Sequence, residues 1–308
     1  MEPVSGDDVR ALRRFNRYFT RRIGALDEHC LGRERPLGEA RLLSEVGHGT
    51  GTSLRELRSR LGLDAGYLSR MVKTLQAQGL LLVTVHPEDS RLRVARLTDA
   101  GHAEVAEQNR RADGLAAGLL QGLSGTQRGE LTAAVAVTER LLRLAGIAVD
   151  VVDGASRDAR ACLAAYAADL DARFPEGFDP AALVRPGEVS DRAGAFVVAY
   201  EEGQPVGCGA LRRLGRGVGE IRHVWVHPGA RRLGLARRIL RELERQAVDR
   251  GFAAVRLDTH AVLAEATALY RACGYTEIPR YDDNTCAAHW FEKRLRRAPG
   301  RPAPRVPE

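Results

Sequence analysis

The segment Arg231–Ala236, RRLGLA, has the residue types and the spacing of an anion-binding loop. An apolar run, VWVHP, comes before it, and after Gly234 apolar residues recur at helical spacing, so we expect a helix to begin inside the segment. The first N–H groups of a helix lack intrahelical partners and, together with the helix dipole, favour an anion. Gly234 and Ala236 leave room for a phosphate beside the backbone, and Arg231 and Arg232 add positive charge. The segment therefore predicts a site for a pyrophosphate group.

Other interpretations of this segment fit the residues to different degrees. It is neither GxGxxG nor a sequence ending in GK[ST], which argues against a dinucleotide fingerprint and against a P-loop. A plain connection between a strand and a helix, and a basic surface for nucleic acid, stay open as alternatives.

A second group of residues with a recognisable pattern lies between positions 53 and 96, where eight side chains are basic and four are acidic. Leucines at helical spacing predict a short helix that ends at Gly62, and Asp64 is suited to cap a second helix. The apolar side of the second helix is Leu68, Met71, Val72 and Leu75. Its opposite side presents Tyr67, Ser69, Arg70 and Lys73. Two short helices with a tight turn and a basic outer face predict a helix-turn-helix that binds the phosphate backbone of DNA.

The sequence LLVTVHPEDSRLRVARLT follows the second helix and predicts a hairpin. It alternates between apolar and polar residues, turns at Pro87–Ser90, and alternates again. Arg91 and Arg93 lie near the expected tip. A hairpin in this position is a wing, and we expect both arginines to contact DNA.

Residues 7–145 resemble the winged-helix domain of the MarR family. The matching pieces are a long first helix, the segment LGLDAGYLSRMVKTLQAQGLL, the DSR of the wing, and LTDAG at the start of the next helix. The resemblance implies that the terminal helices form a homodimer, that the second helix of the helix-turn-helix enters the major groove of double-stranded DNA, and that Arg91 reaches the minor groove. A winged helix that serves only for dimerisation is the alternative.

The loop RRLGLA belongs to a second region, which begins near Ile147, where a helical pattern changes to strand alternation. A helical stretch around Leu163, a hairpin with its turn at Gly203, and the strand Glu220–Val226 follow. A helix after Gly234, a further buried strand, another helix and the closing strand HWFEKRL complete the pattern. Strands that alternate with helices and hairpins predict an α/β domain with a mixed sheet.

The pattern RxxGxA directly after VWVHP resembles the acetyl-CoA-binding motif of the GNAT N-acetyltransferases. The stretch ALYRACGY resembles a later helix of the same superfamily, and the likeness covers about residues 149–295. It implies a GNAT domain that takes acetyl-CoA as cosubstrate and an amine as acceptor. The implied contacts to acetyl-CoA are Val224, Trp225 and Val226 along the pantetheine arm, and Arg231, Arg232, Leu233, Gly234, Leu235 and Ala236 around the pyrophosphate.

The resemblance also implies two catalytic side chains. Tyr270 occupies the tyrosine position of the family and would protonate the departing thiolate. Glu220, eleven residues before Arg231, occupies the place of a general-base glutamate found in some members. A structural carboxylate is the alternative for Glu220, a packed core tyrosine is the alternative for Tyr270, and His223 is a further candidate base. Leu263 replaces an asparagine that contacts the cofactor in many members, which leaves one pantetheine hydrogen bond in doubt.

A chain of 308 residues, 44% hydrophobic and 28% charged, is typical of two globular domains. We predict an α+β two-domain protein with a MarR-like domain at 1–146, a GNAT domain at 147–297 and a basic, Pro-rich disordered tail at 298–308. No apolar run approaches the ~20 residues of a membrane span, and the N-terminus lacks a signal-peptide pattern, so we expect a cytoplasmic protein without membrane contact. The five cysteines lack metal-ligand spacing, which predicts buried thiols and no metal site.

The leading interpretation is a bifunctional protein, a transcriptional regulator that is also an acetyl-CoA-dependent N-acetyltransferase. One alternative is a regulator whose GNAT domain only senses acetyl-CoA, and another is an acetyltransferase whose winged helix only dimerises. The sequence identifies neither the acceptor amine nor the DNA operator, and it does not distinguish a repressor from an activator.

Overall fold

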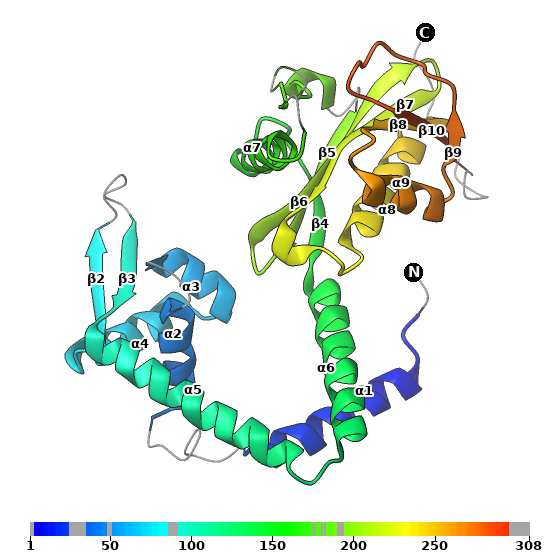
Figure 1. The fold of residues 1–308 in the computed structure, drawn as a ribbon. Helices are drawn as coiled ribbons and strands as arrows, with labels where there is room; N and C mark the ends of the chain where they lie inside the picture. The colour runs from blue at the N-terminus through cyan, green and yellow to red at the C-terminus, as the bar shows by residue number, and fades with distance from the viewer. Residues whose placement is uncertain are drawn as a thin grey trace. The chain divides into compact units, whose positions relative to one another are not determined.

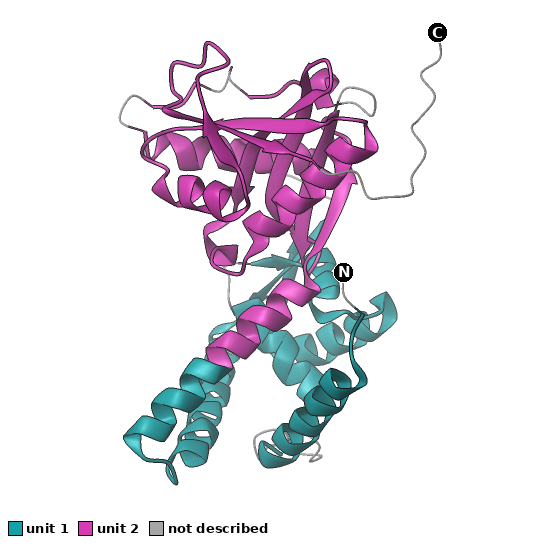
Figure 2. Ribbon diagram, turned by 90° about the vertical axis from the view of Figure 1, so that its right-hand side faces the viewer, with its two compact units in different colours: residues 1–134 teal, residues 135–308 magenta. Residues whose placement is uncertain are grey.

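The computed structural model describes residues 3–24, 35–47, 51–85, 92–174, 177–179, 181, 183–189 and 194–295. The chain forms two compact units, residues 1–134 and 135–308, coloured separately in Figure 2. The units divide within helix α6 (Gly125–Gly146), and the domain boundary predicted from the sequence falls at the last residue of the same helix. The predicted tail at 298–308 lies outside the described residues.

The first unit contains most of the helices and a small sheet (Figure 1). Its helices, besides α6, are α1 (Gly6–Arg22), α2 (Leu37–Gly47), α3 (Leu54–Leu61), α4 (Ala65–Ala77) and α5 (Asp99–Leu120). Its strands are β1 (Thr52–Ser53), β2 (Leu81–Val85) and β3 (Arg93–Leu97), in the antiparallel order β1-β3-β2. The sequence pattern did not indicate β1, which pairs with β3 through two residues only.

The predicted helix-turn-helix is confirmed as α3 and α4. Gly62 ends α3 in the left-handed conformation, with φ 63°, which a glycine adopts without a steric penalty. The Asp64 side chain caps α4 by accepting a hydrogen bond from the backbone N–H of Tyr67 at 2.8 Å. The buried side of α4 consists of Leu68, Met71, Val72 and Leu75, as predicted. These residues pack with α2, α3 and the wing into one core.

The second unit is a mixed sheet of seven strands with helices on both faces (Figure 1). In chain order its strands are β4 (Ala148–Val152), β5 (Gly194–Glu201), β6 (Gln204–Gly215), β7 (Val218–Val226), β8 (Ala254–Thr259), β9 (Thr276–Ile278) and β10 (His289–Arg294). The helices are α7 (Arg157–Asp171), α8 (Leu235–Asp249) and α9 (Ala264–Ala272). The strand order is β4-β5-β6-β7-β8-β10-β9, and every pair is antiparallel except β7 with β8.

Two hydrophobic cores lie on the two sides of this sheet. Helices α8 and α9 cover one face, where Leu235, Ile239, Leu240 and Leu243 of α8 are fully buried. Helix α7 covers the other face through Cys162 and Leu163. The predicted hairpin β5–β6 is confirmed, with Gly203 in its turn. Strand β9 was not predicted, because three residues are too few to show a pattern.

The described cysteines are free thiols with different degrees of burial. Cys162 and Cys208 are buried, as expected, and Cys273 is half-buried. The prediction of a buried thiol is wrong for Cys286, which is exposed on the loop between β9 and β10. A loop that follows the edge strand β9 gives a side chain less cover than a position within the sheet.

Candidate active site and candidate nucleic-acid interface

The loop Arg231–Gly234 leads directly into the first turn of α8. The helix begins at Leu235, and its N-cap, Gly234, has φ 91° and makes no side-chain capping bond. Arg232 also has a positive φ, 63°, which is uncommon for a residue with a side chain. Within the described part of the chain, the backbone N–H groups of residues 232–236 donate no hydrogen bond. Five consecutive free donors at a helix N-terminus are suited to binding a phosphate.

The side chains of this loop separate into buried and charged ones. Leu233 and Leu235 are buried in the core beneath α8 and hold the loop in place. The Arg231 guanidinium donates to the Val226 carbonyl at 3.1 Å and to Asp169 of α7 at 2.7 Å. Arg232 is exposed. Part of the positive charge next to the N–H groups is therefore neutralised by the ion pair with Asp169.

Strands β7 and β8 diverge beside the loop. They pair in parallel only at three positions, from Val218 to Glu220 on β7. Val224 and Val226 lie beyond this point, where β7 keeps β6 as its neighbour and β8 no longer pairs with it. Except for the Val226 carbonyl, which accepts from Arg231 at 3.1 Å, the main-chain groups on the open side of β7 are thus available to an extended ligand. The Trp225 side chain, by contrast, is packed in the core under α7 and does not line the pocket described below.

A β-bulge lies in β7 at the same place. His223 and Val224 together oppose Gly209 of β6, since the register shifts between the flanking pairs. His223 has φ 54°, and its Nε2 accepts a hydrogen bond from the Val184 backbone N–H at 2.9 Å. Burial, with help from the charges of Arg222 and Arg212, lowers the pKa of His223 to about 3. A ring that is neutral and already accepts a hydrogen bond is poorly suited to act as the general base.

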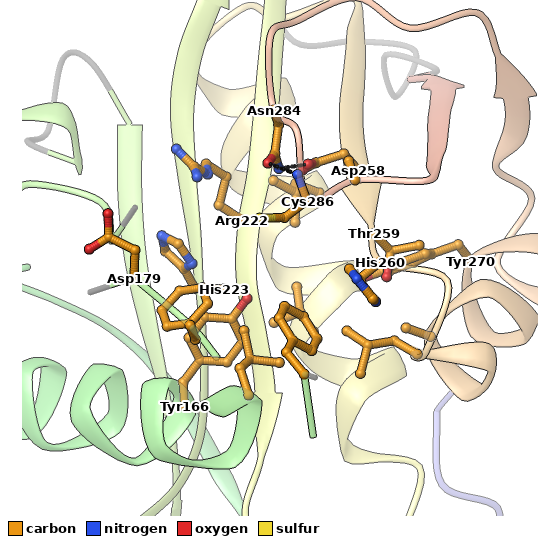
Figure 3. A pocket seen from close by; sticks show the side chains of 18 residues that line it. Tyr166, Asp179, Arg222, His223, Asp258, Thr259, His260, Tyr270, Asn284 and Cys286 are labelled. Carbon is orange, nitrogen blue, oxygen red and sulfur yellow. Dashed lines mark hydrogen bonds between the residues drawn. The ribbon is translucent and has the colours of Figure 1, made fainter. Parts of the chain in front are cut away.

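A pocket opens between the diverging strands and the C-terminal end of α7 (Figure 3). Its volume is about 850 Å³ with the solvent at its mouth included. Its aromatic lining consists of Tyr166, Phe174, Phe178, His260 and Tyr270. Its polar lining includes Asp179, Arg222, Asp258, Thr259 and Asn284. Val224 and Leu263 also face it, so it is continuous with the open side of β7.

Tyr270 of α9 lines this pocket although its side chain is 7% exposed. Its ring packs against Tyr275 and Phe291, with centroid distances of 5.9 Å to each. Among the described residues, none forms a hydrogen bond with the Tyr270 hydroxyl. Burial, followed by the nearby charge of Asp258, raises the pKa of Tyr270. A protonated hydroxyl that faces a pocket is able to donate a proton or a hydrogen bond.

Glu220 lies apart from the pocket lining. It is 1% exposed, its Oε2 accepts from the Arg212 guanidinium at 2.5 Å, and its Oε1 accepts from the Tyr281 hydroxyl at 3.0 Å. Arg212 also binds Glu188 at 2.7 Å. With both oxygens engaged, Glu220 has the surroundings of a structural carboxylate, and its assignment as a base stays a prediction.

The carboxylate that does face the pocket is Asp258 of β8. Asn284 donates a hydrogen bond to it, as the dashed line in Figure 3 shows. Asp258, Glu220 and Asp282 each offer an oxygen within 4.8 Å of the others. Each of the three also accepts a hydrogen bond from a protein side chain, which for Asp282 is the Trp290 indole at 2.9 Å. Burial raises the pKa of Asp258, and the charges of Asp282 and Glu220 act in the same direction.

Several residues that line the pocket were not predicted from the sequence. Asp258 follows an apolar strand pattern within RLDTH, and a charge at that place is a usable signal. Phe174 and Phe178 flank the turn sequence PEG, and the sequence alone offers no reason to bring them to the sheet. Asn284 is 26 residues away from Asp258 in the chain, a pairing that only the fold reveals.

The candidate nucleic-acid interface lies on α4 in the first unit. Tyr67, Ser69, Arg70 and Lys73 are all exposed on the side opposite the buried one. The Arg70 guanidinium lies over the Tyr67 ring, 5.9 Å from its centroid. Arg93 is exposed at the start of β3, in the wing, and Arg91 lies outside the described residues. The structure thus places four predicted contacts on one helix and a fifth on the wing.

Helices α1 and α6 expose apolar side chains. The exposed ones on α1 are Val9, Leu12, Phe15, Tyr18 and Phe19. Those on α6 are Leu131, Val135, Val137, Leu141 and Leu142. Neither helix has a buried residue. Such contiguous apolar stripes are typical of surfaces that another protein chain covers.

Comparison with known proteins identifies relatives of each unit. Residues 32–92 match the MarR family and residues 160–275 match the acetyltransferase (GNAT) family. An IAA acetyltransferase of Azospirillum brasilense is 37% identical over 83 residues, which are 27% of this chain and 54% of that protein. An HTH-type transcriptional regulator of Bacillus subtilis, YdgJ, is 26% identical over 108 residues, 34% of this chain and 63% of that protein.

A solved structure matches part of the chain at low similarity. The ribosomal-protein-alanine N-acetyltransferase from Brucella melitensis is 23% identical, with a TM-score of 0.39, and the match covers 48% of this chain and 99% of that one. The chain spans less than two thirds of the length of the two curated relatives. In the described part of the chain, no helix combines the length and the apolarity that crossing a membrane requires.

Proposed function

The chain joins a MarR-family domain to a GNAT-family acetyltransferase domain, and we propose that it is a DNA-binding regulator that also transfers an acetyl group from acetyl-CoA to an amine. The observation that carries the enzymatic part is the free N–H groups of residues 232–236, next to the open side of β7. The loop fits a pyrophosphate, and the open strand edge fits an extended arm with amide groups. The two features lie at the two ends of one path, as a long thioester cosubstrate requires.

The chemistry needs a deprotonated amine next to a thioester and an acid for the thiolate that leaves. Acetyl-CoA supplies the activated acetyl group. The Tyr270 hydroxyl faces the pocket without a partner among the described residues, and we assign it the proton that neutralises the thiolate. We assign Glu220 to holding Arg212 and Tyr281 in position, because both of its oxygens are engaged. Main-chain groups of Val224 and Val226 bind the pantetheine arm in this proposal.

The regulatory part of the proposal rests on α4, the wing and the exposed apolar stripes. Arg70 and Lys73 on α4 and Arg93 on the wing provide the charge that binds phosphates of double-stranded DNA. The stripes on α1 and α6 provide the surface for a second copy of the chain. A dimer would present two copies of α4 to a near-palindromic site. Binding chromosomal DNA and using acetyl-CoA both require a location in the cytoplasm.

The test is a calorimetric titration of acetyl-CoA into the wild type and into Gly234→Glu. The variant puts a carboxylate in the phosphate site and strains a backbone with φ 91°. The matched control is Gly217→Glu in the β6–β7 turn, where φ is 76° and no atom lies within 4 Å of an added Cβ. Saturable binding that is lost only in Gly234→Glu supports the proposal.

The same titration separates the alternatives. A wild type that does not bind acetyl-CoA contradicts the enzymatic part and leaves the DNA-binding part as the function. Binding without turnover of any amine would favour a domain that only senses acetyl-CoA.

A further inference from the structure

The aromatic wall of the pocket is one connected cluster that comes mainly from α7 and the segment after it. Phe174 stacks on His260 with 4.2 Å between ring centroids and an interplanar angle of 25°. Phe178 packs edge-on against both Phe174, at 6.3 Å, and Tyr166, at 5.8 Å. Phe174 is buried and Phe178 is half-buried, so the wall continues from the core to the mouth of the pocket. A surface of this kind binds an apolar or aromatic group and offers little to a polar one.

The opposite end of the pocket is polar, with the carboxylate of Asp258, the amide of Asn284 and the guanidinium of Arg222 in its lining. In Figure 3, Asp258 and Asn284 lie at the top of the pocket and Tyr166 lies at the bottom. The Asn284 amide donates to Asp258 Oδ2, which fixes the carboxylate and leaves Oδ1 for a ligand. Asp258 and Tyr270 both line this pocket, so the carboxylate and the hydroxyl assigned to the leaving thiolate face the same space. An ammonium group held at Asp258 would therefore be next to the reacting end of the cosubstrate.

We propose that the acceptor is a primary amine joined by a short chain to an aromatic or similarly apolar group, with its ammonium on Asp258 and its apolar group against Phe174, Phe178 and Tyr166. This inference rests on the proposed acetyltransferase function and names the substrate class of the same site. The ammonium gives one proton to water, its nitrogen bonds to the acetyl carbon, and the thioester C–S bond breaks. The thiolate takes a proton from Tyr270, and the Tyr270 oxygen takes the second proton from the nitrogen. The products are an N-acetyl amide and a free thiol.

Other amine classes fit this lining less well. A polyamine carries charges at regular intervals and needs acceptors along its whole length, whereas Tyr166, Phe174, Phe178 and His260 contribute aromatic rings to the lining of this pocket. An aminosugar would bring hydroxyl groups against those rings and leave them without hydrogen-bond partners, which is unfavourable. An arylalkyl amine has one positive charge and one apolar group. The charge matches Asp258 at one end of the pocket, and the apolar group matches the aromatic rings at the other.

The test measures thiol release from acetyl-CoA by the full chain with three amines at pH 8. We expect kcat/KM for 2-phenylethylamine to exceed that for ethanolamine and for spermidine by about tenfold or more, because a buried ring adds binding energy that the other two lack. Phe178→Ala should raise the KM for 2-phenylethylamine about tenfold and leave its kcat, and the KM for ethanolamine, nearly unchanged. Phe178 is half-buried, so this variant should fold. Phe15→Ala on α1 is the matched control.

Asp258→Asn tests the polar end with almost the same shape. It should lower kcat/KM for 2-phenylethylamine about a hundredfold, in line with the loss of a hydrogen bond to a charged group in a buried site. Calorimetric titration of 2-phenylethylamine into the protein saturated with CoA should show weaker binding for the variant. Asp249→Asn, on the exposed surface of α8, is the control and should behave as the wild type.

Failure of this inference is distinct from failure of the proposed function. If acetyl-CoA binds and spermidine or ethanolamine is the better acceptor, the substrate class is wrong while the enzymatic function stands. An Asp258→Asn variant with unchanged amine binding overturns the role of Asp258. If acetyl-CoA does not bind at all, the proposed function itself fails.

Discussion

The guanidinium of Arg231 is ion-paired with Asp169, with 2.7 Å between Nη2 and Oδ2, so the loop Arg231–Gly234 is joined to α7. The same arginine donates from Nε to the Val226 carbonyl, on the strand that borders the pantetheine path. The sequence indicated Arg231 as a source of charge for a pyrophosphate. In the structure its main contacts are with the protein, which makes it a residue that positions the loop.

A double-mutant cycle separates these two roles of Arg231. If the ion pair positions the loop, Arg231→Ala and Asp169→Ala should each weaken acetyl-CoA binding by a similar factor, about fivefold. The double variant should then be no weaker than either single one, as calorimetry can establish. A loss confined to Arg231→Ala, with Asp169→Ala unaffected, would mean that the guanidinium binds the phosphates directly.

Replacing Tyr270 by Phe removes only a hydroxyl that faces the pocket. We expect kcat to fall about tenfold or more while the dissociation constant of acetyl-CoA is nearly unchanged, because the acid acts only when the thiolate leaves. Steady-state kinetics and calorimetry provide the two values. Tyr275→Phe, which removes a hydroxyl bonded to Glu244, is the control. An unchanged kcat in Tyr270→Phe would leave the acid to be found elsewhere.

The buried ring of His223 makes stability depend on pH in a defined direction. The pKa of His223 is about 3 in the folded protein and 6.5 as the ordinary value, so between these values the unfolded chain binds a proton that the folded one excludes. This group therefore lowers the free energy of unfolding as pH falls from 6.5 towards 3. In His223→Gln, the melting temperature should decline less between pH 7 and pH 4 than in the wild type.

His102→Gln is the control for that comparison, because it removes an exposed histidine and leaves His223 in place. Glutamine at 223 retains an acceptor for the Val184 N–H, which limits other effects on folding. Parallel pH profiles for the wild type and His223→Gln would contradict the assignment.

On α4, Arg70→Ala and Lys73→Ala should each weaken binding to a mixed-sequence DNA duplex. Each contact with a phosphate contributes about one unit to the slope of log K against log salt, so each variant should flatten that slope by about one unit. Fluorescence anisotropy at several salt concentrations gives the slope. Arg110→Ala, on α5 and paired with Glu107, is the control. Identical slopes in all variants would remove α4 from the interface.

The apolar stripe on α1 should hold two copies of the chain together. Phe15→Glu places a charge in the middle of this stripe and should shift the protein from dimer to monomer in sedimentation experiments, because a buried unpaired carboxylate is costly. Arg17→Glu, on the opposite, basic side of α1, should leave the dimer intact. Dimers of equal strength in both variants would place the interface elsewhere.

The parts of the fold that depend on neighbouring residues were predictable from the sequence. Asp64 and Gly62 fix the ends of α3 and α4 through local hydrogen bonds and backbone conformation, and Gly234 does so for α8. The positions of the wing strands and of the β5–β6 hairpin follow from alternation and turn residues. The geometry of these elements depends on interactions between residues about four positions apart or fewer, so the sequence pattern predicts it.

The arrangement of the pocket depends on contacts between distant segments. The bulge at His223 is stabilised by a hydrogen bond from the Val184 N–H, which lies in another segment. The residues near position 223 in the sequence therefore do not predict the bulge. Burial raises the pKa of Asp258, and the charges of Asp282 and Glu220, which come from other elements, act in the same direction. Glu220 was assigned as a general base because of its position in a motif. The Arg212 side chain that donates a hydrogen bond to its carboxylate comes from the adjacent strand, β6.

The two halves of the proposed active site come from separate stretches of the chain. The phosphate loop and the helix after it, residues 231–249, serve the cosubstrate, whereas the aromatic wall is mostly supplied by residues 166–178. Substitutions in the second stretch can therefore change which amine is accepted while the acetyl donor stays the same. Over evolutionary time, such a division lets paralogues acquire new acceptors through exchanges in about a dozen residues. In the laboratory, libraries restricted to this stretch are the economical route to altered specificity.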